Sequence, residues 1–415
     1  MSTRRNAIHL YIIQGTNILV PLLALPYLGR ALGPEAFGTL AFSQLILQYL
    51  ILTTDFGFNL TATRRISQAN SNRENLSEIV INTSVVRMVL AFTACAIVYT
   101  ALSLTPSLTS TRTLILISFV SVIGSVMTPA WLFHGLEKNH IFAAITAVPR
   151  FLSLIPLAIY VKTPSDLELA AWLQFAPQFV TGLLCLAWIA VSRPFIYTKP
   201  KLSHIRYAFT DGIHIYTSTI LSSIYIYANG IIIRFVGGEA ALGLYSASEK
   251  LVKAVGAMTS PAVQAIYPRV CAGSNPSLKY IYAFVITFTS MCWVGAVVLG
   301  DWLVPLIYGR SFVESASVLK VLTISPIFAG LTMISVQLKI LAWGEHKRLK
   351  WIYATSVAFH CIQAPLMVNE FSVIGAAASV VLTEFLTFVL VSRTVKRIRV
   401  NNQQIKDTAT SAAPH

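Results

Sequence analysis

Apolar runs of about 20 residues, the length that a helix needs to cross a bilayer, follow one another along almost the whole chain. Short polar segments separate them, so each run predicts one membrane-spanning helix. The runs lie near 8–28, 37–59, 79–103, 113–133, 141–161, 169–191, 207–233, 244–265, 280–300, 314–336, 351–369 and 372–392. The pattern predicts an all-α polytopic membrane protein with twelve transmembrane helices.

A short motif occurs twice, half a chain apart. Leu28–Gly38 is LGRALGPEAFG and Ile232–Gly243 is IIRFVGGEAALG, so that Arg30 matches Arg234 and Gly33 matches Gly237. In this alignment the one extra residue of the second copy follows Ala240. A repeat after six spans predicts two parallel six-helix repeats, as in many transporters.

The repeat also predicts the division of the chain into domains. We expect an N-terminal six-helix bundle over 1–200 and a C-terminal six-helix bundle over 201–392. Residues 393–415 are expected to form a basic cytoplasmic tail.

Composition supports the membrane assignment and explains the charge. Hydrophobic residues make up 55% and charged residues 11% of the chain, whereas soluble domains carry about 25% charged residues. The net charge is +15, and most Lys and Arg residues fall in the segments on one side of the predicted spans. This bias predicts that both termini are cytoplasmic. Because these residues are spread over short segments, we expect no nucleic-acid partner.

Five basic residues fall inside the predicted spans: Arg87, Arg150, Lys250, Lys253 and Lys320. A basic residue that faces lipid at mid-bilayer costs about 2.5–3.5 kcal/mol. Most of them are therefore expected to face a water-filled cavity or a partner. An interior with excess positive charge favours an anionic substrate. These five are candidate substrate-binding residues.

Several charged residues allow a structural interpretation beside the functional one. Glu249 is four residues from Lys253, so the two either form an ion pair or belong to a binding site. Asp55 is either a helix cap or an acid that couples transport to protons. Arg30 and Arg234 lie at turns, where they either pack the helix ends or contact substrate.

Motifs typical of membrane enzymes are missing from the sequence. There is no G-x-x-x-x-G-K-[ST] loop, no D-x-D, no H-E-x-x-H and no C-x-x-C. The loops opposite the basic side are short. We therefore expect no catalytic activity, no organic cofactor and no bound metal centre.

Three segments carry a resemblance to a known family. Thr53–Ser67 is TTDFGFNLTATRRIS, and Leu242–Leu251 is LGLYSASEKL; the third is LGRALGPEAFG. Together with the length and the repeat, they resemble Wzx-type O-antigen flippases of the polysaccharide transporter family. That family lies within the superfamily of multidrug, oligosaccharidyl-lipid and polysaccharide exporters.

The resemblance implies a transporter of the bacterial inner membrane, used in lipopolysaccharide biosynthesis. It would move an undecaprenyl-pyrophosphate-linked oligosaccharide to the periplasmic leaflet by alternating access of two bundles arranged in a V. An H⁺ or Na⁺ gradient would drive it, with Asp55 and Glu249 as candidate coupling or gating residues. Membrane lipid, a polysaccharide polymerase and a chain-length regulator are further expected partners. Lys250 matches the lysine of the family's span-8 segment.

Two other functions stay open at this stage. A multidrug-extruder-type antiporter would share the architecture, but it would need an acidic cavity for its cationic substrates. A membrane glycosyltransferase or polymerase would need external loops and carboxylates that this sequence lacks.

Overall fold

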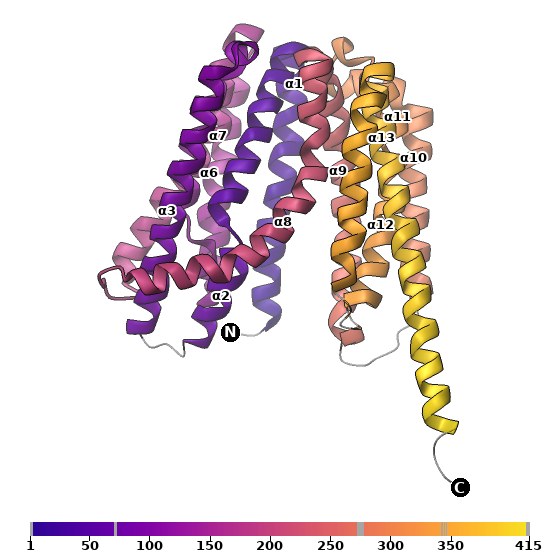
Figure 1. The fold of residues 1–415 in the computed structure, drawn as a ribbon. Helices are drawn as coiled ribbons and strands as arrows, with labels where there is room; N and C mark the ends of the chain where they lie inside the picture. Colours follow the sequence, from indigo (N-terminus) through magenta and orange to yellow (C-terminus); the bar gives the residue numbers. More distant parts are fainter. Residues whose placement is uncertain are drawn as a thin grey trace. The chain divides into compact units, whose positions relative to one another are not determined.

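The computed structural model describes residues 3–69, 73–271, 278–341, 343, 345 and 347–411, and all regular elements within them are helices (Figure 1). By Cα proximity the chain divides into an N-terminal unit, Met1–Ser223, and a C-terminal unit, Ile224–His415. The boundary lies inside a helix, later than the division predicted at residue 200. It lies there because the first half of that helix packs on the N-terminal unit.

The N-terminal unit contains seven helices among its described residues, besides the first part of α8 (Leu202–Val236). They are α1 (Thr3–Asp55), α2 (Phe58–Gln68), α3 (Arg73–Leu104), α4 (Thr109–Met127), α5 (Ala130–Gly135), α6 (Asn139–Tyr160) and α7 (Leu167–Ser192). Single turns of 3₁₀ helix, Pro106–Leu108 and Pro164–Asp166, precede α4 and α7.

The C-terminal unit contains the last part of α8 and five further helices in its described part. They are α9 (Gly238–Cys271), α10 (Lys279–Tyr308), α11 (Ser315–Leu322), α12 (Ser325–Ser335) and α13 (Lys347–Ser411). A 3₁₀ turn, Arg310–Phe312, follows α10, and a π-helical segment, Val336–Leu341, continues α12. The expected tail at 393–415 begins as part of α13, which stays helical to Ser411.

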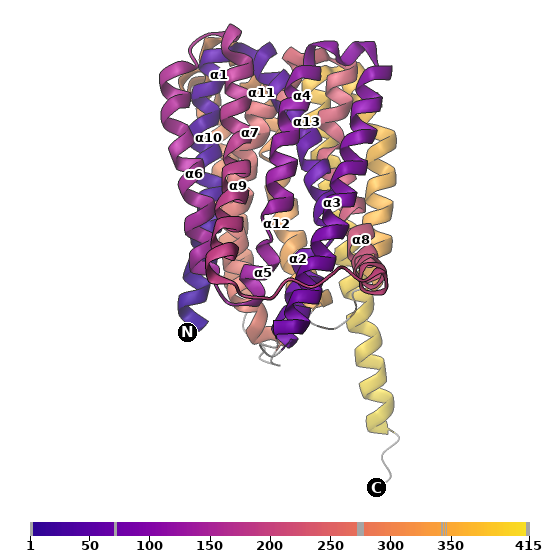
Figure 2. The ribbon, with the colours of Figure 1, turned by 90° about the vertical axis from the view of Figure 1, so that its left-hand side faces the viewer.

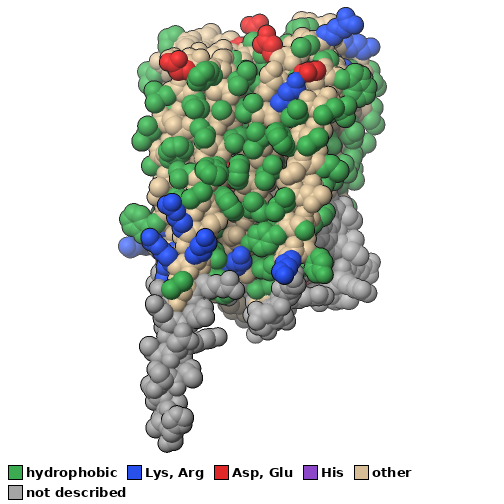
Figure 3. Space-filling view, turned by 90° about the vertical axis from the view of Figure 1, so that its right-hand side faces the viewer, with side chains coloured by type: hydrophobic (Ala, Val, Ile, Leu, Met, Phe, Trp, Pro, Cys, Tyr) green, Lys and Arg blue, Asp and Glu red, His purple; other side chains and the backbone are tan. Residues whose placement is uncertain are grey.

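Eight segments of the described residues are long and apolar enough to cross a membrane. The structure therefore supports a multi-pass membrane protein, while the predicted number of twelve crossings is not confirmed. Two of the eight, Leu19–Gln68 and Arg348–Ile398, are 50 and 51 residues long and contain kinks. Apolar side chains cover the middle of the face in Figure 3, while charged side chains lie toward its upper and lower edges, as expected for a membrane-facing surface.

The kink in α1 lies at Gly33, whose φ is 74°. Its counterpart in the second copy of the motif is Gly238, with φ 84°, rather than Gly237. Because only glycine adopts this conformation without strain, the two turn glycines identify the equivalent positions. The alignment that pairs Gly33 with Gly237 is therefore one residue out at the turn, and the extra residue of the second copy precedes Gly238.

The DFGFN segment forms a tight joint between α1, α2 and the first half of α8. Phe56 and Gly57 both have positive φ, of 47° and 80°, and α2 begins directly after them. The Phe56 ring stacks on Phe209 and Tyr216 of α8, with centroids 4.9 and 4.5 Å apart. This part of α8 lies across the lower ends of α2 and α3 (Figures 1 and 2).

Replacing Gly57 by alanine is expected to destabilise this joint. A Cβ atom there would lie 2.8 Å from Ile215 Cβ, and the backbone has φ 80°. Strain of about 1–2 kcal/mol from the left-handed backbone would add to about 1–3 kcal/mol from overpacking. The measurement is the midpoint of thermal unfolding in detergent. Gly238→Ala is the control, since φ is 84° and nothing lies within 4 Å; equal losses for both variants would contradict the joint's tight packing.

Candidate functional site

Arg87 on α3 is buried against the carboxyl end of α4. Its side chain is only 4% exposed. Nη2 donates to the Ser125 carbonyl at 2.8 Å, and Nη1 donates to the Thr128 carbonyl at 3.2 Å. A cation at a helix carboxyl end is stabilised by the helix dipole. Arg87 thus connects α3 to the end of α4. The Asp55 carboxylate is close enough to attract the Arg87 guanidinium.

Arg150 on α6 joins the same polar network through α7. Its Nη2 donates to Gln178 Oε1 at 3.2 Å, and Gln178 Nε2 donates to Thr128 Oγ1 at 3.3 Å. Thr128 in turn accepts from Arg87 through its carbonyl. The structure therefore brings together two arginines that lie 63 positions apart in the sequence, with Gln178 and Thr128 between them.

Arg87 and Arg150 differ in what they can do. Arg87 is buried and its guanidinium donates hydrogen bonds to backbone carbonyls, which favours a structural role. Arg150 and Gln178 are half-buried, so part of each side chain stays exposed. Substrate contact by either arginine stays a prediction, and the geometry favours Arg150.

Asp55 is the last residue of α1, directly before the left-handed turn. Its carboxylate accepts a hydrogen bond from the Asn59 side chain. This contact and the attraction to Arg87 connect the acid to α2 and α3. The N-terminal cap of α2 is Gly57, and no side chain caps that helix, so Asp55 is not its cap. A part of Asp55 in proton coupling stays a prediction.

Lys250 and Lys253 lie three residues apart on α9, in the C-terminal unit. The Lys253 Nζ atom is 3.1 Å from Glu249 Oε1, which shows the predicted i,i+4 ion pair. It also lies 5.3 Å from the centre of the Tyr227 ring, a cation–π distance. The Lys253 side chain is 50% exposed even so. Lys250 is half-buried and lies within Coulombic reach of both Glu249 and Lys253.

Other predicted site residues have structural contacts or lie at the surface. Arg234 forms an ion pair with Glu239 at 2.6 Å across the turn between α8 and α9, and its side chain is only 10% exposed. Lys320 on α11 contacts both carboxylate oxygens of Asp301 on α10, at 2.8 and 2.7 Å. Arg30 is exposed. The geometry thus favours helix-end packing for Arg234 and a structural ion pair for Lys320.

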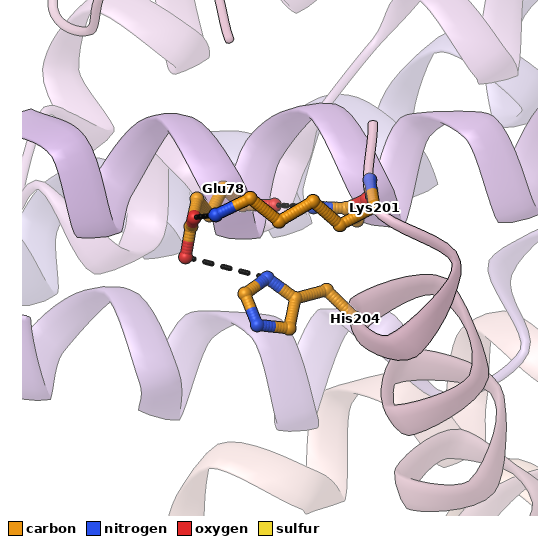
Figure 4. A network of polar contacts seen from close by, with 4 residues as sticks. Glu78, Lys201 and His204 are labelled. Carbon is orange, nitrogen blue, oxygen red and sulfur yellow. Dashed lines mark hydrogen bonds and ion pairs between the residues drawn. The ribbon is translucent and has the colours of Figure 1, made fainter. Parts of the chain in front are cut away.

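A further polar network lies where the segment before α8 meets α3 (Figure 4). Lys201 and His204 both contact the carboxylate of Glu78, His204 through Nδ1 at 3.3 Å. The Lys201 backbone N–H donates to Asn82 Oδ1 at 2.9 Å. These contacts hold the start of α8 on α3; the Lys201 side chain is 59% exposed, and those of His204 and Glu78 are 38% and 26% exposed. Their role is structural.

The sequence analysis missed Gln178, Thr128 and Asp301 as parts of these networks. A signal for Gln178 was present, since Gln174 and Gln178 are four residues apart inside an apolar run. Thr128 and Asp301 had no such signal, because their partners are distant in sequence. Within the described residues no group of three His, Cys, Asp or Glu side chains is placed to hold a metal ion.

Comparison with solved structures identifies the fold. The chain superimposes on the lipid II flippase MurJ in an inward closed conformation with a TM-score of 0.75, at 10% identity, over 95% of this chain and 88% of that one. A multidrug resistance transporter of the MATE family, in its inward-facing conformation, gives a TM-score of 0.69 at 14% identity over 95% and 99%. Fold and composition thus define a multi-pass membrane protein with a transporter fold.

Sequence comparison identifies the family. The family model described as polysaccharide biosynthesis protein matches residues 3–272. A candidate O-antigen transporter of Escherichia coli (strain K12) is 30% identical over 403 residues, which are 93% of this chain and 95% of that protein. One of Shigella dysenteriae is 27% identical over 95% and 100%. The chain belongs to the polysaccharide biosynthesis protein family.

Proposed function

We propose that this protein is a flippase for undecaprenyl-pyrophosphate-linked repeat units of O-antigen or a similar surface polysaccharide. It would move them from the cytoplasmic to the periplasmic leaflet of the bacterial inner membrane. The relatives named as O-antigen transporters match almost the whole chain and support this substrate class. The fold shared with the lipid II flippase is compatible with it.

The observation that carries the proposal is the pair Lys250 and Lys253 on α9. Two lysines three residues apart on a helical face, one of them half-exposed, would attract a dianion such as pyrophosphate. Glu249 is the acid near both lysines, and its ion pair with Lys253 would break when the pyrophosphate binds Lys253. Lysine acts here as a point charge.

The rest of the mechanism follows from this assignment as a proposal. The glycan would occupy the wet interior while the polyprenyl tail stays in lipid, and two parallel six-helix repeats would alternate their access to the two leaflets. Coupling to H⁺ or Na⁺ would involve Asp55 or Glu249. Both termini would be cytoplasmic, and a polymerase and a chain-length regulator would act on the product.

A multidrug-extruder function is less well supported. The MATE transporter shares the fold at 14% identity, which says nothing about substrate. Basic residues outnumber acids among the candidate site residues, and a cationic drug would be repelled by Lys250 and Lys253.

The double variant Lys250→Ala/Lys253→Ala is expected to abolish most O-antigen export. Each charge-assisted hydrogen bond to the pyrophosphate contributes about 1.5–3 kcal/mol, so flux at limiting substrate should fall about tenfold or more. The measurement is surface O-antigen in a strain that lacks the gene and carries the variant, together with the lipid-linked oligosaccharide that accumulates.

Lys396→Ala is the matched control, because Lys396 is exposed on α13. It should restore surface O-antigen fully. Normal surface O-antigen in the double variant, at normal protein level, would contradict the proposal. Resistance to cationic dyes on overexpression would instead favour the multidrug-extruder function.

A further inference from the structure

Two glutamines of α7 face the interior of the N-terminal unit. Gln174 and Gln178 are four residues apart and therefore share one side of the helix. The exposed apolar residues of α7, which include Leu169, Trp172 and Leu183, lie on the opposite side by helical periodicity. The glutamines thus point away from the surface that α7 presents to lipid.

Each glutamine contacts a polar residue from another helix. Gln44 Nε2 on α1 donates to Gln174 Oε1 at 3.1 Å. Arg150 Nη2 on α6 donates to Gln178 Oε1 at 3.2 Å. We call these four residues, Gln44, Gln174, Gln178 and Arg150, the amide strip. All four are half-buried, and they form a polar line across α1, α7 and α6.

The amide strip is held rigidly from behind. Gln178 also donates to Thr128 Oγ1, and Arg87 fixes the Thr128 carbonyl. The Gln178 backbone lies directly against Gly124 of α4, where a Cβ atom would come within 2.5 Å of it. Side chains that are pre-positioned in this way lose little entropy when they bind a ligand.

The chemistry of the amide strip matches hydroxyl groups. A carboxamide offers both donors and acceptors, as a sugar hydroxyl does. It carries no positive charge, which a binding site for pyrophosphate would need. Placing a half-buried amide against lipid hydrocarbon costs free energy. Such amides are therefore expected inside a membrane where they contact water or a polar ligand. The arginine adds a planar donor fork that hydroxyls or an acidic sugar can use.

We propose that the amide strip binds the sugar hydroxyls of the transported oligosaccharide, as a glycan subsite separate from the pyrophosphate-binding lysines. The inference rests on the proposed flippase function. It predicts that the strip distinguishes glycosylated from unglycosylated carrier lipid.

The test compares the affinities of the purified full-length protein, in detergent, for two probes. One is undecaprenyl pyrophosphate that carries the host's own repeat unit, extracted from cells that lack the flippase; the other is undecaprenyl pyrophosphate alone. For Gln174→Met/Gln178→Met we expect the Kd of the glycosylated lipid to rise about tenfold, the loss of about two hydrogen bonds. The Kd of the unglycosylated lipid should stay unchanged. If the double variant does not accumulate, the same two affinities are measured for Gln174→Met alone, which leaves the Arg150 and Thr128 contacts in place.

The matched control is Gln363→Met, a half-buried glutamine of α13 that donates to Ser379 and Thr383 in the C-terminal unit. It should leave both affinities unchanged. Equal weakening of both probes by the double variant, or weakening of neither, would overturn the glycan subsite while the flippase assignment stands. A wild-type protein that binds neither probe would overturn the proposed function itself.

Discussion

Replacing Arg87 by leucine is expected to lower the free energy of unfolding by about 3–5 kcal/mol, a large part of the stability of a folded domain. The guanidinium donates to the Ser125 and Thr128 carbonyls, and these charge-assisted bonds lie in a buried environment. Their loss costs about 1.5–3 kcal/mol each. Asp55 would also lose the cation within its Coulombic reach.

The measurement for Arg87→Leu is the yield of folded protein and its thermal midpoint in detergent. Arg112→Leu is the control, because Arg112 is half-buried and its guanidinium lies 5.9 Å from the Tyr99 ring centre, a contact of small energy. If Arg87→Leu retained the wild-type midpoint but lost export, Arg87 would be a substrate ligand rather than the fastening of α4. Arg87→Lys should be intermediate, since one ammonium does not reproduce the two-pronged contact.

The second large effect is expected from Gly124→Val. A Cβ atom at position 124 would lie 2.5 Å from the carbonyl carbon and oxygen of Gln178. On the other side of the contact, a Cβ atom on Gly182 would lie 2.8 Å from the Gly124 carbonyl oxygen. These two glycines let the backbones of α4 and α7 touch, which is how membrane helices pack closely. Valine would force the helices apart at a cost of about 3 kcal/mol or more.

Gly295→Val is the matched control for this prediction. Gly295 lies in α10, also a predicted membrane span, and nothing lies within 4 Å of a Cβ atom there. The thermal midpoint should fall strongly for Gly124→Val and little for Gly295→Val. A stable Gly124→Val protein would show that α4 and α7 do not meet at this contact. Displacing Gln178 should also weaken binding of the glycosylated lipid, because α7 carries half of the amide strip.

The sequence predicted several local features well. The spacing of Glu249 and Lys253 predicted their ion pair, since a helix brings residues four apart together. The DFGFN segment was singled out, but not its conformation, in which Phe56 as well as Gly57 takes a positive φ. That strain is retained because Phe56 stacks between aromatic rings of α8. Such compensation comes from residues more than 150 positions away and leaves no local signal.

The candidate site shows where sequence reasoning stops. Arg87, Arg150 and Lys250 were equivalent by the cost of placing a charge in a membrane, which depends only on depth. Their surroundings separate them: Arg87 is enclosed by carbonyls, Arg150 is joined to Gln178, and Lys250 lies beside an acid and a second lysine.

By itself the sequence determined that this is a multi-pass membrane protein and to which family it belongs, because hydropathy and motifs are properties of contiguous residues. The predicted number of twelve crossings is not confirmed. The sequence also placed the turn of the internal repeat to within one residue. Only the tertiary structure decided which glycine makes that turn, which arginine donates to backbone carbonyls and which glutamines contact polar residues of neighbouring helices. Those outcomes depend on contacts between helices distant in the chain. Helical periodicity predicts the face on which a side chain lies but not the residue that meets it.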